Sequence, residues 1–138
     1  MSRQILVIED NEQNLYLLKF ILEKHGYEVR TAQDGPEGID KATSVRPDLI
    51  LLDVQLPGMD GYAVARRLRS NPDLAKTPIV AVTSYAMPGD REKALESGCT
   101  GYIEKPINPD TFMTQVEEYL LTAARKEAPD HGTSVDNG

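Results

Sequence analysis

Cysteine is almost absent from this chain of 138 residues, in which Cys99 is the single example. A lone cysteine cannot form an internal disulfide, so we expect a protein of a reducing compartment, the cytoplasm. Long apolar runs are missing as well, because no stretch approaches the roughly 20 residues that a membrane-spanning helix needs. The opening MSRQILVIED also lacks the pattern of a targeting segment. The sequence therefore predicts no membrane partner.

Positive charge is in short supply. The 15 lysines and arginines are outnumbered by 22 acidic residues, which gives a formal net charge of −7. Nucleic acids and anionic membranes both bind basic faces, so the sequence predicts that neither is a partner. The length and the hydrophobic content of 40% fit a single globular domain. An acidic domain of this kind attracts cations or a basic patch on another protein.

Short branched apolar runs recur along the chain at Ile5–Ile8, Leu49–Leu52 and Ile79–Val82. Their apolar residues are continuous rather than alternating, which is typical of parallel strands covered on both faces. Two further segments, Tyr27–Thr31 and Gly101–Lys105, alternate instead. Alternation indicates less complete cover, so we expect these two strands at the edges of the sheet.

Helical patterns separate these strands. Apolar spacing, Pro at first turns, Asp at an N-cap and Gly at a C-cap predict five helices. They cover residues 12–25, a segment opening at Pro36, Gly61–Arg69, Pro88 to Gly98, and Pro109 to about Ala124. Five alternations of strand and helix indicate right-handed βαβ units. We therefore predict an α/β fold, a flavodoxin-like doubly wound (βα)5 three-layer sandwich with parallel sheet order 2-1-3-4-5.

The last residues, 125–138, have no periodicity and are rich in polar residues, Pro and Gly. We expect them to form a disordered polar tail, which leaves residues 1–124 as the domain.

Chemically active side chains stand where the predicted strands end. They are Glu9, Asp10, Asp53, Thr83 and Lys105. The carboxyl ends of parallel strands meet at one edge, so these side chains should lie together. Clustered carboxylates repel one another unless a cation joins them, and hard oxygens suit Mg²⁺. A lysine and a hydroxyl beside them can bind a phosphoryl group, and a carboxylate there can be a nucleophile.

Four segments, in this order and at these separations, resemble the receiver domain of two-component response regulators. They are VIEDN (residues 7–11), LLDVQLPGMDG (51–61), AVTS (81–84) and GYIEKP (101–106). The resemblance covers about residues 3–122. Within the family it is greatest to stand-alone, single-domain regulators of the chemotaxis or cell-division type.

The resemblance implies that Asp53 accepts a phosphoryl group from a phosphohistidine. The donor would be a sensor histidine kinase or a histidine phosphotransfer protein. It further implies that Asp10 and Asp53 bind Mg²⁺ directly, that Gln55 adds its backbone carbonyl, and that Glu9 acts through a water. The chain would then be a signalling module rather than an enzyme, with self-phosphorylation and slow autodephosphorylation only.

The resemblance also implies a switch. Thr83 would bond the phosphoryl oxygens, Lys105 would pair with the phosphate, and the Lys105–Pro106 peptide would be cis. Tyr102 would turn inward as Thr83 moves, which would remodel the surface of the fourth helix, fifth strand and fifth helix for a downstream target protein. The expected state is a monomer or a weak homodimer.

The first helix offers a docking surface for the phosphodonor at Asn14, Leu15 and Leu18, although core packing also explains these leucines.

Two other functions are open. A phosphatase of the haloacid dehalogenase type also forms an aspartyl phosphate, but it needs a second acid where Gln55 stands. A constitutive, unphosphorylated scaffold would not need the complete set of acids, hydroxyl and lysine.

Overall fold

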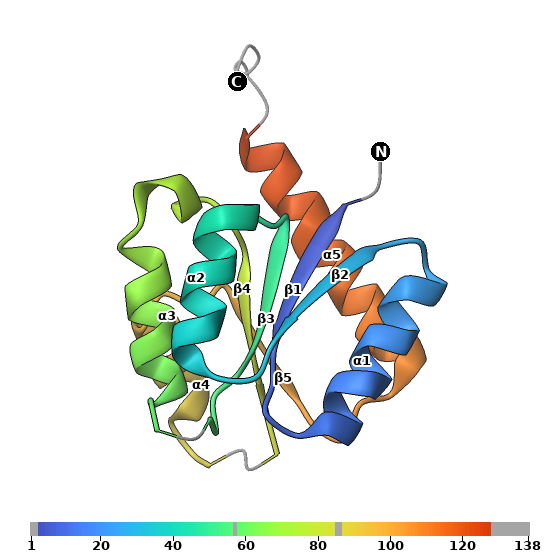
Figure 1. The fold of residues 1–138 in the computed structure, drawn as a ribbon, viewed down its shortest axis with the longest axis horizontal. Coiled ribbons are helices and arrows are strands. Elements are labelled where there is room, and N and C mark those ends of the chain that lie inside the picture. The colour runs from blue at the N-terminus through green and yellow to red at the C-terminus, as the bar shows by residue number, and fades with distance from the viewer. Residues whose placement is uncertain (1–2, 57, 85–86, 128–138) are drawn as a thin grey trace.

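The computed structural model describes residues 3–56, 58–84 and 87–127. Within these residues, strands and helices alternate along the chain (Figure 1). The strands are β1 (Gln4–Ile8), β2 (Glu28–Ala32), β3 (Leu49–Asp53), β4 (Ile79–Thr83) and β5 (Gly101–Glu104). The helices are α1 (Glu12–Lys24), α2 (Gly35–Val45), α3 (Gly61–Arg69), α4 (Asp90–Glu96) and α5 (Pro109–Glu127), with a 3₁₀ turn at Pro72–Leu74.

All the strand pairs are parallel, and the sheet order β2-β1-β3-β4-β5 confirms the predicted one. The continuous apolar runs occupy the centre, where every residue of β3 and β4 is buried. The alternating segments form the edges, and β2 has a mixed pattern of buried and exposed residues. The difference between continuous and alternating apolar residues therefore separated the inner strands from the edge strands.

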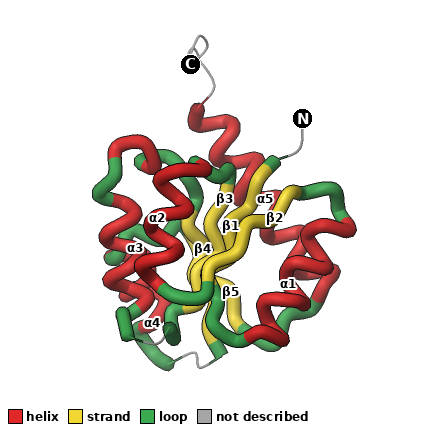
Figure 2. The backbone as a smooth tube through the Cα atoms, viewed as in Figure 1, coloured by secondary structure: helices red, strands yellow, loops and turns green. Residues whose placement is uncertain are grey.

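Helices cover both faces of this sheet and make three layers (Figure 2). Leu6 and Ile8 of β1 belong to the core beneath α2, α3 and α4. Ile5 and Val7 belong to the opposite core, beneath α1 and α5. Successive side chains of a strand point to opposite faces, so each inner strand supplies both cores.

Side-chain caps fix several helix starts. Asp60 accepts a hydrogen bond from the N–H of Tyr62, which confirms the predicted start of α3.

Helix α4 begins two residues later than predicted from Pro88 because Gly89 has a left-handed φ of +89°, which a helix cannot include. Helix α5 continues to Glu127, beyond the predicted end, and residues 128–138 of the expected tail lie outside the described residues. In the described ranges, no helix is long and apolar enough to cross a membrane.

Candidate functional site

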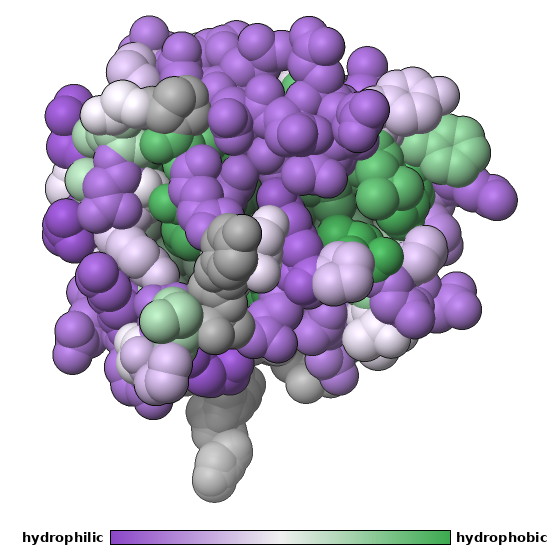
Figure 3. Space-filling model, turned by 90° about the horizontal axis from the view of Figure 1, so that it is seen from below, coloured by the Kyte–Doolittle hydropathy of each residue, from purple (hydrophilic) through white to green (hydrophobic). Residues whose placement is uncertain are grey.

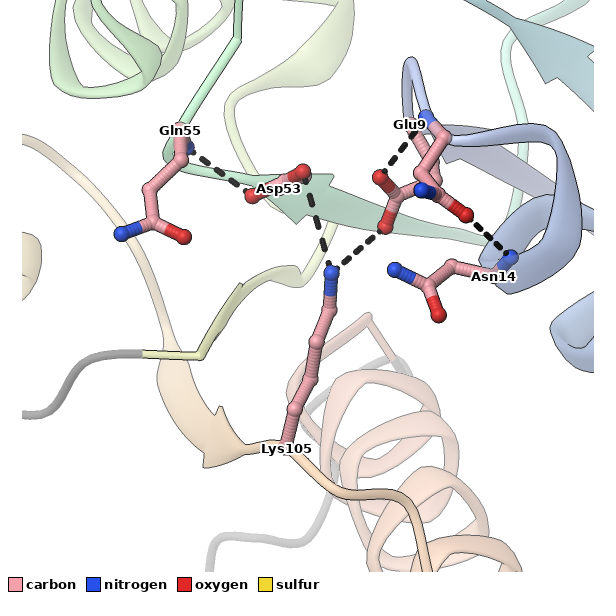
Figure 4. Close-up of polar contacts among 6 residues, drawn as sticks. Glu9, Asn14, Asp53, Gln55 and Lys105 are labelled. Atoms are coloured by element: carbon pink, nitrogen blue, oxygen red, sulfur yellow. Dashed lines mark hydrogen bonds and ion pairs between the residues drawn. The ribbon is translucent and has the colours of Figure 1, made fainter.

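The carboxyl edge of the sheet gathers the predicted site residues, of which Figure 4 shows Glu9, Asp53, Gln55 and Lys105. Asp53 and Thr83 are the last residues of β3 and β4, and both are buried. Glu9 follows β1 and donates its backbone N–H to the carbonyl of Ala32 at 2.9 Å. Lys105 follows β5 and donates its backbone N–H to the carbonyl of Thr83 at 2.7 Å. The sheet ladder therefore holds the backbone of each of these residues in place.

Three carboxylates form the acidic part of the site. Glu9, Asp10 and Asp53 each offer an oxygen, and these oxygens all lie within 4.8 Å of one another. Glu9 is 1% exposed and Asp53 is 5% exposed, whereas Asp10 is open to solvent. The sequence prediction that these acids meet is confirmed. Asp10 faces solvent, so a ligand can enter from that side.

The start of α1 orients Glu9. The backbone N–H of Asn11 donates to Oε2 of Glu9 at 3.1 Å, and the side chain of Asn11 accepts from the N–H of Asn14 (Figure 4). Asn11 therefore caps the helix with its side chain and orients the Glu9 carboxylate with its backbone N–H. The preference of Asn for N-cap positions was a signal for the cap, but not for the bond to Glu9.

Lys105 supplies the cationic part of the site. Its Nζ lies 2.8 Å from Oε1 of Glu9 and 3.8 Å from Oδ2 of Asp53 (Figure 4). The resemblance assigned Lys105 to a phosphate and gave no indication of the pair with Glu9. Nothing in the sequence could have found this pair, because it joins residues 96 positions apart whose strands are not neighbours.

The electrostatics of the site favour a divalent cation. The pKa of Glu9 is raised to about 7, mainly by burial and further by the hydrogen bond and charge of Asp53, while Lys105 opposes the rise. With all three carboxyls ionised, one lysine leaves two negative charges uncompensated. Carboxylate oxygens at this spacing are a donor set that Mg²⁺ accepts. The residues present therefore fit the ion that the sequence predicted.

The loop after β3 presents Asp53. The backbone N–H of Gln55 donates to Oδ1 of Asp53 at 2.9 Å. The next turn packs back on the strand, because the N–H of Gly61 donates to the carbonyl of Val54 at 3.3 Å. An added Cβ at Gly61 would lie 2.3 Å from Cα of Val54, so no larger residue fits there. This contact sets the path of the loop that carries Asp53 and Gln55.

Tyr102 lies on the side of β5 that faces α4. Its ring packs against the core beneath α2, α3 and α4, and its hydroxyl is buried without a hydrogen-bond partner among the described residues. The ring itself is partly buried. The Lys105–Pro106 peptide is cis, as the resemblance implied.

Comparison with known proteins identifies the family. Residues 5–117 match the model of the response regulator receiver domain. The chain is 40% identical over 120 residues to the polar-differentiation response regulator DivK of Brucella anthropi, an alignment that covers 87% of this chain and 98% of that protein. The chain therefore belongs to the response regulator receiver domain family.

Solved structures agree with this family. A CheY-like receiver domain protein of Methanospirillum hungatei superimposes with a TM-score of 0.86 at 29% identity, covering 91% of this chain and 99% of that one. The receiver domain of the sensor histidine kinase PA1611 of Pseudomonas aeruginosa has a TM-score of 0.81 at 32% identity, covering 87% and 98%. That second structure holds a magnesium ion in its active site cleft.

Proposed function

We propose that this chain is a single-domain response regulator that accepts a phosphoryl group on Asp53 from a phosphohistidine. The observation that carries the proposal is the position of Asp53. Its buried carboxylate ends a central strand, lies beside two more acids, and has an ammonium at 3.8 Å. That arrangement provides a fixed nucleophile together with charges of both signs.

The proposed phosphoryl transfer is a displacement at phosphorus, in which one bond forms as another breaks. An oxygen of Asp53 forms the new P–O bond while the P–N bond of the phosphohistidine breaks, and the released imidazole takes a proton from water. Lys105 lies close enough to Asp53 to pair with the transferred phosphoryl group, and Thr83 ends the adjacent strand. The side chains that bind and orient the phosphoryl group therefore come from separate, rigid strand ends.

Asp10, Asp53 and the backbone carbonyl of Gln55 would hold Mg²⁺, with Glu9 acting through a water. When bound, Mg²⁺ supplies positive charge against the phosphoryl oxygens. The related kinase receiver domain with magnesium in its cleft supports this assignment.

Apolar side chains gather over α1, next to the edge that carries the site (Figure 3). The large exposed ones on this helix are Tyr16, Leu17 and Phe20. Leu18, by contrast, is buried, so its apolar character is explained by core packing. We propose that the exposed surface meets the phosphodonor, a sensor histidine kinase or a histidine phosphotransfer protein, and that the α4-β5-α5 surface meets the downstream target.

The test is phosphoryl uptake by Asp53. Incubation with acetyl phosphate and Mg²⁺ should add one phosphoryl group to the intact mass. The Asp53→Asn variant should gain none, because an amide oxygen is not a competent nucleophile, while its circular dichroism stays unchanged. Asp48→Asn, one residue before β3, is the matched control and should label like the wild type. Undiminished labelling of Asp53→Asn would refute the proposal.

Mg²⁺ should stabilise the folded protein, because only the native state gathers the three carboxylates. At ten times the dissociation constant, the free energy of unfolding should rise by about 1.4 kcal/mol. For a domain of this size the melting temperature should rise by roughly 5 °C. Differential scanning calorimetry at constant ionic strength measures the effect. The Asp10→Asn variant should respond less, and an unchanged wild-type melting temperature would count against the metal site.

A further inference from the structure

Helix α4 is weakly anchored to the domain. It has seven residues, of which only Ala94 is buried, whereas α1, α2 and α3 each bury at least three. Its N-cap is Gly89, which provides no side-chain hydrogen bond. With so little apolar burial, the position of this helix depends on a few individual contacts.

Two of these contacts join α4 to α3. The ammonium of Lys93 lies 5.1 Å from the centroid of the Tyr62 ring, a distance at which a cation is attracted to the ring face. At the end of α4, a guanidinium nitrogen of Arg66 donates to Oγ of Ser97 at 3.3 Å. Of these two α3 residues, Tyr62 is the nearer to Asp53 along the chain.

Tyr62 connects this contact to the loop after Asp53. It follows Gly61, whose backbone packs directly on Val54, the residue after Asp53. Tyr62 is itself only 7% exposed, so its ring is held by the core of the domain. A continuous set of packed residues therefore runs from the proposed phosphoacceptor to the ring beneath Lys93.

Tyr102 lies in the same core cluster as Tyr62. Burying its hydroxyl without a partner is unfavourable, so other contacts must stabilise the ring in this position. Asp90, in the first turn of α4, is near enough to both rings to contribute to the raised pKa of each hydroxyl, for which burial is the larger cause. The two tyrosines thus share the space beneath the start of α4.

We propose that Lys93 is a positioning residue, whose ammonium over the Tyr62 ring holds α4 across Tyr102 and keeps that tyrosine inward. Lys93 then sets how often the α4-β5-α5 surface adopts this arrangement. The link to phosphorylation rests on the proposed function and on the switch that the family resemblance implies, in which Tyr102 is inward in the phosphorylated state. The contact itself belongs to the protein without phosphate and can be tested independently.

The experiment compares Lys93→Met with Lys93→Arg, which keeps a cation over the ring. Lys24→Met is the matched control, because Lys24 lies 6.0 Å from the Phe20 ring on the distant α1. Amide hydrogen exchange is measured for α4, and ¹⁹F NMR of 3-fluorotyrosine reports the solvent exposure of Tyr102, with Tyr102→Phe assigning its signal. In Lys93→Met, exchange in α4 should be about two- to five-fold faster and the Tyr102 signal should move toward the exposed position.

Lys93→Arg and Lys24→Met should leave both signals at their wild-type values. A methionine variant that matches the wild type, or an arginine variant that loses protection equally, would overturn the proposal. Beryllofluoride, a phosphoryl mimic, tests the link to Asp53. Its affinity for Lys93→Met should be lower than for the wild type by the same two- to five-fold factor as the change in exchange. An unchanged affinity would overturn that link. Failure of the wild type to bind beryllofluoride would refute the proposed function, while the exchange data would still decide the role of Lys93.

Discussion

Replacing Gly61 by alanine should destabilise the domain by about 3 kcal/mol, the upper part of the range for overpacked positions. The added Cβ would lie 2.3 Å from Cα of Val54 and 2.8 Å from its carbonyl carbon and oxygen. These are backbone atoms, so no side-chain rotation can relieve the clash, and the end of β3 must shift. The melting temperature should fall by roughly 10 °C, measured by circular dichroism. Phosphoryl uptake should also slow, because Asp53 and Gln55 belong to the displaced segment.

Gly58→Ala, in the same loop, is the matched control for Gly61→Ala. Gly58 has a left-handed φ of +79°, and an added Cβ would have no neighbour within 4 Å. That variant should therefore lose only the roughly 1 to 2 kcal/mol that a left-handed backbone costs an alanine. An equal loss in both variants would show that the contact with Val54 is not what requires glycine at position 61.

Arg69→Met should lower the free energy of unfolding by about 3 to 5 kcal/mol. Nε of Arg69 donates to the carbonyl of Gly98 at 2.9 Å, and one terminal nitrogen donates at 2.8 Å to the carbonyls of both Leu74 and Thr77. A hydrogen bond from a charged group contributes about 1.5 to 3 kcal/mol, and the network as a whole contributes less than the sum. Urea unfolding followed by circular dichroism gives the change.

The neighbouring Arg67 provides the control, because it is exposed on the same helix. Arg67→Met should change the stability by less than about 0.5 kcal/mol, as surface substitutions generally do. Arg69→Lys should recover only part of the loss, since one ammonium cannot reach carbonyls on both sides of the guanidinium. Wild-type stability in Arg69→Met would mean that water replaces these bonds without cost.

The fold was predictable because its determinants are local and repeat along the chain. Continuous apolar runs specified the buried strands, alternating ones specified the edges, and Asp60 specified the start of α3. The meeting of Glu9, Asp10 and Asp53 followed from one topological rule, that parallel strands end at a common edge. No long-range side-chain contact had to be known for these conclusions.

Other features depend on contacts that no sequence pattern encodes. No motif in the sequence points to the contacts of Arg69, whose guanidinium is surrounded by carbonyls of the loops before β4 and β5. Tyr102 packs against the core beneath α2, α3 and α4 with its hydroxyl buried, a position that the alternating pattern of its strand does not specify. Helix α4 was predicted to start at Pro88 but starts at Asp90, because Gly89 has a left-handed backbone conformation.

The sequence alone therefore determined the class of fold, the order of its strands and the acids, hydroxyl and lysine of the site, since periodicity and strand ends are properties of short segments. The tertiary structure decided how these charges pair. Lys105 reaches Glu9 across an edge where four strand ends meet, and only the assembled sheet sets that 2.8 Å distance. It also decided that the exposed Lys93 lies over the buried Tyr62 ring, because these two residues come from different helices whose separation depends on the packing of the whole layer.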